Sequence, residues 1–369
     1  MSQLNAHLTP AALKAMPKID LHRHLEGSLR LETLLEIARE FNLDVPTDDK
    51  ENLRSLVQIT DDPPDHEVFL SKFEVLRHFY RSPETISKLA YQAVADAAAD
   101  NIHYLELRFS PQALARVRRF ALTDVTDWVI QAVEKACQDF PIEVGLIVTL
   151  VRHDPLEQAR QVAEIAFDYY GKGIVGLDLA GNEVKFPPGP FIPIFKKAKE
   201  VGLGVTIHAG EWASAHGVRQ AMEELYADRI GHGVRTIEHS QILRLARERG
   251  VVFEVCLTSN LQTGVVHDLR HHPLADMLDL GLQATINTDD PSLSNCTLTH
   301  EYELAVQKLG LGYDELRQMI LNATAAAFLP PDGRKRLTAH FEKRLPQPDP
   351  APAKPRIRSS APFFYGSLD

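Results

Sequence analysis

Two histidines separated by one residue, His22 and His24, are the first residues of the chain whose spacing suggests chemistry. They end a short apolar segment that reads as a β-strand, and residues two apart on a strand point to the same face. Both imidazoles could therefore reach one metal ion. The same spacing also suits two hydrogen-bonded histidines at a polar strand end, so the pair alone leaves both interpretations open.

His208 and Asp289, each at the end of another apolar segment, favour the metal. Three neutral imidazoles and one carboxylate suit Zn²⁺ and leave room for a water molecule. Mg²⁺ and Ca²⁺ would instead take oxygen ligands. We therefore predict one Zn²⁺ per chain, which would lower the pKa of a bound water toward neutrality and make hydroxide available.

Further ionisable residues follow the same segments. Glu211 comes three residues after His208 and could carry a proton instead of binding metal, with a pKa set by burial against charge. His232, between two glycines, could orient or deprotonate the water, and a core histidine is the alternative. Asp290 could contact a substrate while Asp289 binds the metal, although helix capping would also explain it.

The elements that must position these residues are eight short apolar segments, predicted to be strands. Stretches with helical spacing separate them, which indicates βαβ units and a parallel sheet. Eight such units predict the α/β class and a (β/α)8 TIM barrel, in which the carboxyl ends of all strands face one mouth that holds the active site. The predicted strands are Lys18–His24, Ile102–Phe109, Glu143–Val151, Ile174–Leu179, Gly204–Ile207, Asp228–Ile230, Val251–Val255 and Gln283–Ile286.

The connection after the first strand is far longer than one helix requires. We predict a helical insertion over about residues 26–100, placed at the barrel mouth where it could form a lid. Phe69, Phe73 and Leu76 lie at helical spacing and could cover a substrate or only pack their own helix. The helices predicted in the insertion are Leu29–Phe41, His66–Tyr80 and Pro83–Ala99. Those predicted later are Asp124–Gln138, Pro155–Tyr170, Phe191–Val201, Val218–Tyr226 and Ser240–Gly250.

Composition narrows the function classes. The 369-residue chain has a formal net charge of −10, which argues against a nucleic-acid partner and, weakly, against an anionic membrane surface. No apolar run is long enough for a transmembrane helix. The chain has 3 cysteines and no CxxC pair, so neither a disulfide framework nor a thiolate zinc site is expected, and we predict a cytoplasmic protein.

The predicted strands and helices also indicate the domain organisation. We predict a single domain over residues 1–345 and a proline-rich tail over residues 346–369. The tail has no helical period and is interpreted as flexible. Docking of the tail through Phe363, Phe364 and Tyr365 is the alternative. The oligomeric state is not predicted.

Taken together, these motifs resemble the adenosine deaminase family of the amidohydrolase superfamily. The resemblance runs in the family's order from about Met16 to the helix near Phe328, and it is the combination of motifs that makes it specific. The matching stretches are MPKIDLHRHLEGSLR (Met16–Arg30), LELRFSP (Leu105–Pro111), GLDLAGNE (Gly176–Glu183), TIHAGEW (Thr206–Trp212), RIGHGVR (Arg229–Arg235), EVCLTSNLQTG (Glu254–Gly264) and TINTDDPSL (Thr285–Leu293).

The resemblance implies a role for each site residue and a purine as the small-molecule partner. Protonation of the purine ring at N1 would make C6 electrophilic, so the proton donor must be protonated in the complex. The implied roles are zinc binding by His22, His24, His208 and Asp289, proton donation to N1 by Glu211, activation or holding of the water by His232, and substrate binding by Gly181 (N3), Asp290 (N7), Glu26 and Asp178.

One position departs from the pattern and bears on the substrate. Glu26 stands where animal adenosine deaminases typically carry an Asp associated with the ribose 5′-hydroxyl, and HLEG also occurs in adenine deaminases of the family. Ser292-Leu293 after NTDDP looks more like the nucleoside enzymes. We therefore predict deamination of adenosine and 2′-deoxyadenosine. Adenine and modified adenosines such as aminodeoxyfutalosine are alternative substrates.

Two other classes compete with this prediction. Binuclear amidohydrolases usually carry a carboxylated lysine at the end of the fourth strand, but Leu177–Gly181 contains no lysine, which favours one metal. A non-catalytic purine-binding protein would be expected to lack a ligand or the proton donor, and all of these residues are present.

Glu211→Gln is expected to lower turnover by about 10²–10⁴-fold, because an amide cannot supply the proton of a general acid. Ammonia release by the zinc-loaded variant measures the loss, with zinc content as the control. Turnover close to that of the unmodified enzyme would exclude Glu211 as the proton donor.

Overall fold

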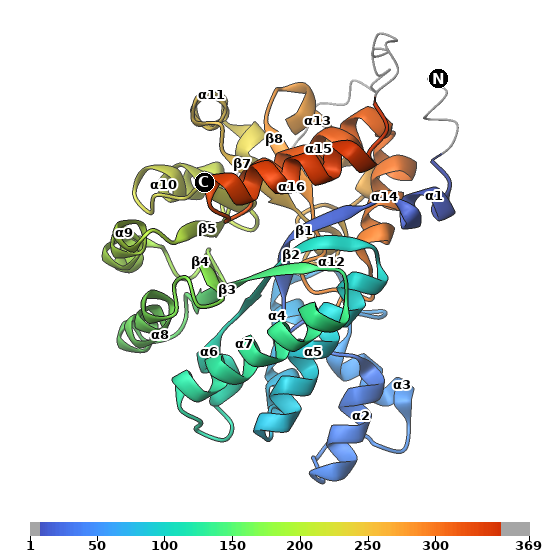
Figure 1. Ribbon diagram of the computed structural model, residues 1–369, viewed down its shortest axis with the longest axis vertical. Coiled ribbons are helices and arrows are strands. Elements are labelled where there is room, and N and C mark those ends of the chain that lie inside the picture. Colours follow the sequence, from blue (N-terminus) through green and yellow to red (C-terminus); the bar gives the residue numbers. More distant parts are fainter. Residues whose placement is uncertain (1–7, 348–369) are drawn as a thin grey trace.

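The structure is a computed structural model that describes residues 8–347. Its centre is one 8-stranded parallel sheet in which each strand pairs with the next one along the chain, from β1 to β8 (Figure 1). Asp289, just after β8, joins β1: its N–H donates to the His22 carbonyl at 2.8 Å and its carbonyl accepts from the His24 N–H at 2.8 Å. The predicted (β/α)8 barrel is confirmed. The strands are β1 (Lys18–His24), β2 (Ile102–Phe109), β3 (Glu143–Val151), β4 (Ile174–Ala180), β5 (Gly204–Ala209), β6 (Arg229–His232), β7 (Val252–Val255) and β8 (Gln283–Ile286).

Strands β1, β2, β3 and β8 begin and end where the sequence predicts. The predicted bounds of the sixth strand were wrong, because it starts one residue later and continues to His232. Asp228 is excluded from β6 since its carboxylate accepts a hydrogen bond from the Val205 N–H at 2.8 Å and pairs with Lys199 at the barrel surface. Strands β4 and β5 run further than predicted, which carries the strands up to the polar residues that follow them.

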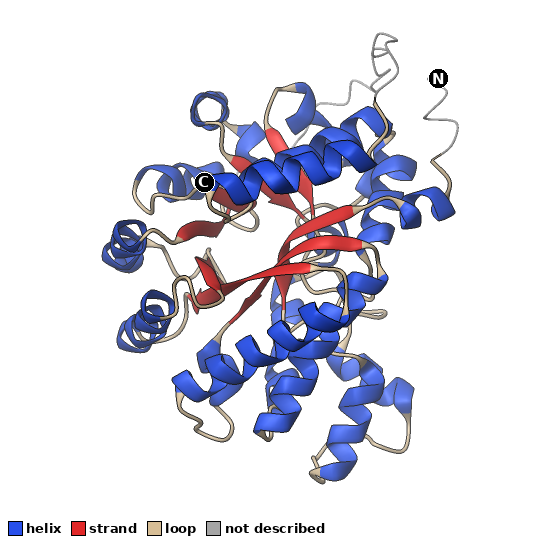
Figure 2. Cartoon of the chain, in the orientation of Figure 1, coloured by secondary structure: helices blue, strands red, loops and turns tan. Residues whose placement is uncertain are grey.

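Helices surround the sheet and cover its outer face (Figure 2). The strands are buried on both faces, as expected for a parallel sheet that helices cover. Predicted helices were found at each place, with ends that differ by a few residues, and further helices follow β8. The helices after β2 are α6 (Pro111–Ala115), α7 (Leu122–Asp139), α8 (Leu156–Asp168), α9 (Ile192–Val201), α10 (Ala215–Glu223), α11 (Ser240–Arg249), α12 (Leu257–Gln262), α13 (Leu274–Asp279), α14 (Leu298–Leu309), α15 (Tyr313–Ala326) and α16 (Pro331–Arg344).

The segment between β1 and β2 contains the helices expected for the insertion and one more (Figure 1). The additional helix, α3, begins after Asp49, whose carboxylate accepts from the Glu51 N–H at 2.9 Å. The predicted helix His66–Tyr80 was too long, because α4 ends at Leu76 and a 3₁₀ turn follows. The elements are α2 (Leu31–Glu40), α3 (Lys50–Val57), α4 (His66–Leu76), η2 (Arg77–Phe79) and α5 (Pro83–Ala99), and α1 (Pro10–Ala15) precedes β1.

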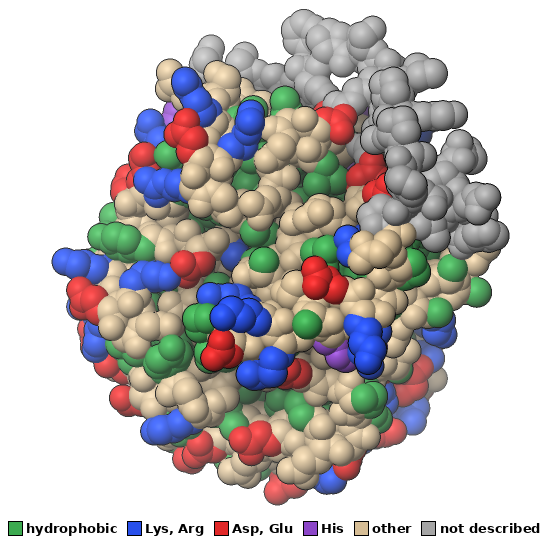
Figure 3. Space-filling model, turned by 45° about the horizontal axis from the view of Figure 1, so that its top comes forward, with side chains coloured by type: hydrophobic (Ala, Val, Ile, Leu, Met, Phe, Trp, Pro, Cys, Tyr) green, Lys and Arg blue, Asp and Glu red, His purple; other side chains and the backbone are tan. Residues whose placement is uncertain are grey.

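Three other expectations concern the C-terminal tail, membrane-spanning helices and the charge of the surface. The predicted tail at residues 346–369 lies almost entirely outside the described residues. Among the helices of residues 8–347, none has the length and hydropathy needed to cross a membrane. On the face in Figure 3, Lys and Arg side chains of the described part alternate with Asp and Glu, so this face carries no extended basic patch of the kind that nucleic-acid binding requires.

Charged side chains, not only apolar ones, fill the barrel interior. Arg229 forms ion pairs with Glu106 and with Glu254, both at 2.5 Å. Arg108 forms an ion pair with Glu254 at 2.9 Å, and all four side chains are buried. The Phe328 ring, which follows α15, stacks on the Arg229 guanidinium at 3.6 Å. Buried charges are tolerated when they are paired, and removing one partner is costly. The network therefore ties the strands to the chain that follows them.

Gly204→Ala is expected to destabilise the protein by about 1–3 kcal/mol, the usual cost of overpacking a well-packed site. A Cβ at Gly204 would overlap the ring of Phe328. Urea unfolding measures the effect, and Gly189→Ala is the matched control because a Cβ there meets nothing within 4 Å. Equal stability of the two variants would contradict the close packing of Phe328 on β5.

Candidate active site

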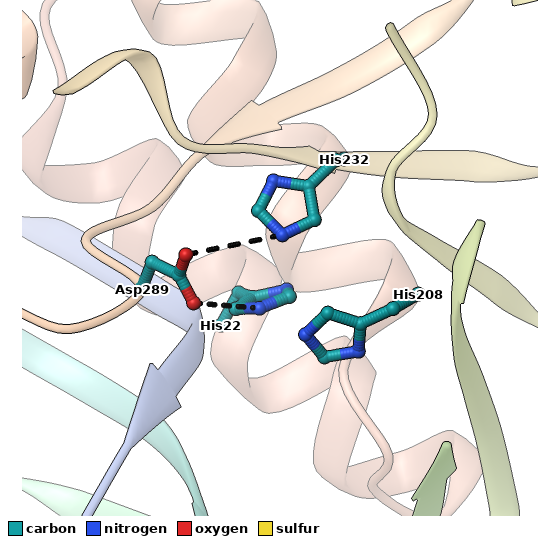
Figure 4. A group of neighbouring side chains, drawn as sticks. All are labelled: His22, His208, His232 and Asp289. Atoms are coloured by element: carbon teal, nitrogen blue, oxygen red, sulfur yellow. Dashed lines mark ion pairs between the residues drawn. The ribbon is translucent and has the colours of Figure 1, made fainter. Parts of the chain in front are cut away.

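Three residues predicted to bind metal, His22, His208 and Asp289, come together at the carboxyl ends of the strands with His232, which was predicted to act on the water. His22, His208, His232 and Asp289 each offer a ligand atom, and these atoms all lie within 4.8 Å of one another. Figure 4 shows the four side chains, from β1, β5, β6 and the segment after β8, pointing toward a common centre. All four are buried. The cluster fits a metal site.

His24, the remaining predicted ligand, joins this cluster from the side of His208. Its Nε2 lies 3.3 Å from the His208 Nε2 and 3.4 Å from the Asp289 Oδ1, while the His22 Nε2 lies 3.2 Å from the same oxygen. Ligands held at about 2.0–2.1 Å from a tetrahedral zinc ion are separated by roughly 3.3 Å. The three separations match that distance, whereas the group of mutually close ligand atoms contains His232 in place of His24, so both histidines are candidates for the same ligand position.

Buried carboxylates orient two of the histidines from behind. Glu254 lies 2.7 Å from the His22 Nδ1, and Asp178 lies 3.0 Å from the His208 Nδ1. Burial would raise the pKa of the Asp178 carboxyl, but His208 and then Arg108 hold it well below its ordinary value. Each carboxylate accepts the Nδ1 proton, so the Nε2 lone pair faces the centre of the cluster, as metal binding needs.

Asp178 was predicted to contact the substrate, and the structure places it elsewhere. It lies behind His208 and is not among the described residues that line the cavity of the site. We propose that it supports a ligand instead. From the sequence, no role was assigned to Glu254, the first residue of the motif EVCLTSNLQTG. No local pattern indicated that its carboxylate reaches His22 across the barrel.

The backbone is strained where two of the central side chains enter the cluster. His232 has φ of +59° and Asp289 has φ of +61°, in the left-handed region that residues with a Cβ rarely adopt. Such strain costs about 1–3 kcal/mol per residue and persists where the surrounding structure enforces it. For Asp289, two backbone hydrogen bonds with β1 hold this conformation, and strain of this kind occurs often at functional sites.

Glu211 lies beside the cluster on the loop after β5. Its Oε2 is 3.6 Å from the His232 Nε2, and the side chain is buried. Burial, and then the charges of Asp289 and Glu183, raise the pKa of the Glu211 carboxyl well above its ordinary value. A carboxylic acid that stays protonated at neutral pH is what proton donation requires.

The loop that carries Glu211 is held by a single carboxylate that sequence reasoning did not single out. Glu183 Oε1 accepts from the N–H groups of Glu211 at 2.8 Å, Trp212 at 2.6 Å and Ala213 at 2.8 Å. Its Oε2 accepts from the Gly210 N–H at 2.9 Å. Four donors to one carboxylate fix the loop backbone, so the direction of the Glu211 side chain depends on the end of β4.

A cavity of about 380 Å³ opens beside the cluster, between the strand ends and the insertion. Phe69, Phe73 and Leu76 of α4 form an apolar cover on one side. Helix α4 contacts the loop after β5, because the His66 ring stacks on the Trp212 ring with 4.9 Å between ring centres. The polar wall opposite includes His24, Glu26, Gly181, Glu211, His232, Asp289 and Asp290.

Two acidic side chains in this wall keep a carboxyl oxygen without a hydrogen-bond partner among the described residues. Glu26 accepts from the Ser110 N–H at 2.7 Å through Oε1, while its Oε2 makes no hydrogen bond, and burial raises the pKa of Glu26 to about 7. The Asp290 Oδ1 is likewise buried and unpaired, and a Cβ at Gly27 would occupy its place. A buried polar atom without a hydrogen-bond partner costs free energy, so these two oxygens are suited to form hydrogen bonds with a bound ligand.

Asp178→Asn is expected to weaken metal binding by about 10–100-fold, since partners of metal-binding histidines contribute this much to affinity. Competition with a chelator of known affinity measures the change, and Asp332→Asn on the exposed face of α16 is the matched control. Unchanged affinity in Asp178→Asn would show that Asp178 does not support a ligand.

Comparison with known proteins identifies the family of the chain. The family model described as adenosine deaminase matches residues 17–344. An adenosine deaminase of Klebsiella pneumoniae subsp. pneumoniae is 39% identical over 315 residues, which cover 85% of this chain and 94% of that protein. An adenosine deaminase of Serratia proteamaculans is 40% identical over 314 residues, with the same two coverages.

Solved structures extend the likeness to neighbouring activities. An adenine deaminase of Arthrobacter aurescens superposes with a TM-score of 0.81 at 26% identity and covers 89% of this chain and 98% of its own. The N6-mAMP deaminase of Arabidopsis gives 0.80 at 27% identity, over 90% and 99% of the chains. An amidohydrolase of Burkholderia ambifaria with bound zinc gives 0.83 at 25% identity, over 91% and 92%. The chain belongs to the adenosine deaminase family.

Proposed function

We propose that the protein is a zinc-dependent aminohydrolase that converts adenosine and 2′-deoxyadenosine to inosine and 2′-deoxyinosine. The reaction consumes one water molecule and releases ammonia. The observation that carries the proposal is the buried Glu211 carboxyl, which lies next to a three-histidine and carboxylate cluster at the base of a cavity with an apolar cover.

The metal would be held by His22, His24, His208 and Asp289, whose donor atoms are those that zinc prefers. The distances from Asp289 to His22 and His24, and from His24 to His208, suit neighbouring ligands of one ion. The structure of the Burkholderia ambifaria relative with bound zinc supports the choice of metal. When bound, zinc lowers the pKa of water toward neutrality and so makes a nucleophile available at physiological pH.

Glu211 would hold the proton that the purine needs. The carboxyl donates it to N1, which makes C6 electrophilic and lets the ring accept electrons while water adds to C6. Ammonia then leaves from C6 with one proton of the added water, the other water proton returns to the Glu211 carboxylate as C6 becomes a carbonyl, and the ring keeps its proton on N1 in the product. Burial raises the pKa of the Glu211 carboxyl and so favours the protonated form that proton donation requires. The activity should decline as pH rises through this raised pKa.

The remaining polar groups would orient the base. Asp290, with its raised pKa, can present a hydroxyl to the acceptor N7; burial is the main cause and the charge of Asp289 adds to it. Gly181, with φ of +97° in the cavity wall, can turn its N–H toward N3. The apolar side chains of α4 would cover the ribose and exclude water from the reacting centre.

The choice between substrates depends on the part of the site that would contact the sugar. The unpaired Oε2 of Glu26 is suited to a hydroxyl donor of a nucleoside and would repel the phosphate of a nucleotide. The relatives with 39% and 40% identity are adenosine deaminases, whereas the adenine deaminase structure is only 26% identical. Adenine stays the second candidate because Glu26 departs from the Asp typical of animal adenosine deaminases.

Ammonia release from adenosine, 2′-deoxyadenosine, adenine, N6-methyl-AMP and aminodeoxyfutalosine tests the proposal. We expect the two unmodified nucleosides to be consumed fastest, because they offer both a purine face and a hydroxyl for Glu26. Preference for adenine would transfer the proposal to the free base. A protein that holds one zinc per chain and releases no ammonia from any of the five would contradict it.

The three cysteines are unpaired in the structure, which supports a reducing compartment, and we propose the cytoplasm.

A further inference from the structure

A chain of buried hydrogen bonds leads away from His232 to a backbone N–H. The His232 Nδ1 lies 3.2 Å from the Asn260 Nδ2, and the Asn260 Oδ1 lies 3.1 Å from the His272 Nε2. The His272 Nδ1 in turn accepts from the Leu274 N–H at 3.0 Å. All three side chains are buried, with at most 3% of the residue exposed. Each link therefore has to be made within the protein.

The direction of these hydrogen bonds is set at Leu274. A backbone N–H can only donate, so the His272 Nδ1 must carry a lone pair. Burial lowers the pKa of His272 to about 3, and the ring is neutral at physiological pH. A neutral imidazole has one proton, which must lie on Nε2. His272 therefore donates to Asn260.

The hydrogen bond from His272 also determines how the Asn260 amide is oriented toward His232. The atom that accepts from the His272 Nε2–H must be the amide oxygen, which leaves the amide NH₂ facing His232. An amide NH₂ only donates, so the His232 Nδ1 accepts and cannot carry a proton. The single proton of the neutral ring then lies on Nε2, the atom 3.6 Å from the Glu211 Oε2 and 3.9 Å from the Asp289 Oδ2.

The other two rings of the cluster have the opposite arrangement. His22 and His208 face carboxylates, Glu254 and Asp178, which accept the Nδ1 proton and leave each Nε2 bare. A metal ligand needs the bare nitrogen, and a general base needs it too. Only a donor remains at the His232 Nε2. The group on Nδ1 thus distinguishes His22 and His208, which can bind a metal through Nε2, from His232, which cannot.

We infer that Asn260 and His272 are positioning residues that hold His232 as an Nε2–H donor, so that His232 orients the hydrolytic water and neither binds the metal nor takes a proton from the water. The same polarity gives the fourth metal position to His24. The role toward water rests on the proposed function, whereas the position of the proton on the ring does not.

Asn260→Asp tests the inference with little change in shape. The carboxylate still accepts from His272, but it now also accepts from His232, which moves the ring proton to Nδ1 and bares Nε2. We expect kcat to fall by about 10–100-fold, by analogy with the loss seen when the partner of a metal-bound histidine is changed, while KM stays within a few-fold. Asn52→Asp, an exposed change of the same charge on α3, should leave kcat unchanged.

Nitrogen-15 spectra of histidine-labelled, zinc-loaded protein provide the second measurement, with the His232 signals assigned by their absence from His232→Gln. In the unmodified protein we expect a protonated Nε2 and a bare Nδ1, reversed in Asn260→Asp. A protonated Nδ1 in the unmodified protein, or full turnover by Asn260→Asp, would overturn the inference. Failure of the proposed function would instead show as no ammonia release with the expected spectrum.

Discussion

The Glu254 carboxylate is the interaction on which both the barrel and its site depend. It accepts from Arg229 at 2.5 Å, His22 at 2.7 Å, Arg108 at 2.9 Å and Thr206 at 2.9 Å, so four strands meet at one buried anion. Burial would raise the pKa of Glu254, but the charges of Arg108 and then Arg229 hold it well below its ordinary value. The ionised state that keeps the core paired also orients a metal ligand. Stability and function are therefore joined in the same group.

The rest of the site follows from what stands behind each reacting side chain. Carboxylates support His22 and His208, an amide supports His232, and Glu183 holds the loop of Glu211 through four N–H groups. These partners decide which nitrogen is bare, which is protonated and where the acid points. Residues of one type thereby take different roles within a few ångströms. The chemistry depends on outer partners as much as on the groups that would touch the substrate.

Much of this was open to prediction from the sequence. Alternating strand and helix patterns determined the barrel, because parallel strands buried on both faces leave strong apolar segments between helices. The motifs around His22, His208, Glu211 and Asp289 lie at the ends of those segments, and a barrel gathers strand ends at one mouth. The sequence therefore determined the fold, the metal-binding character of the cluster and the family. It also identified Glu211 as the candidate acid.

Only the tertiary structure decided the contacts that join residues far apart in the chain. Glu254 reaches His22 across 232 positions of sequence, and Glu183 reaches the Glu211 loop across 28, so no local pattern reveals either contact. Asp178 has the residue type of a substrate contact, yet its place behind His208 indicates a supporting role. The proton position on His232 depends on a partner that the fold brings to it. Residue types set which chemistry is available, whereas hydrogen-bond partners in space set which atom performs it.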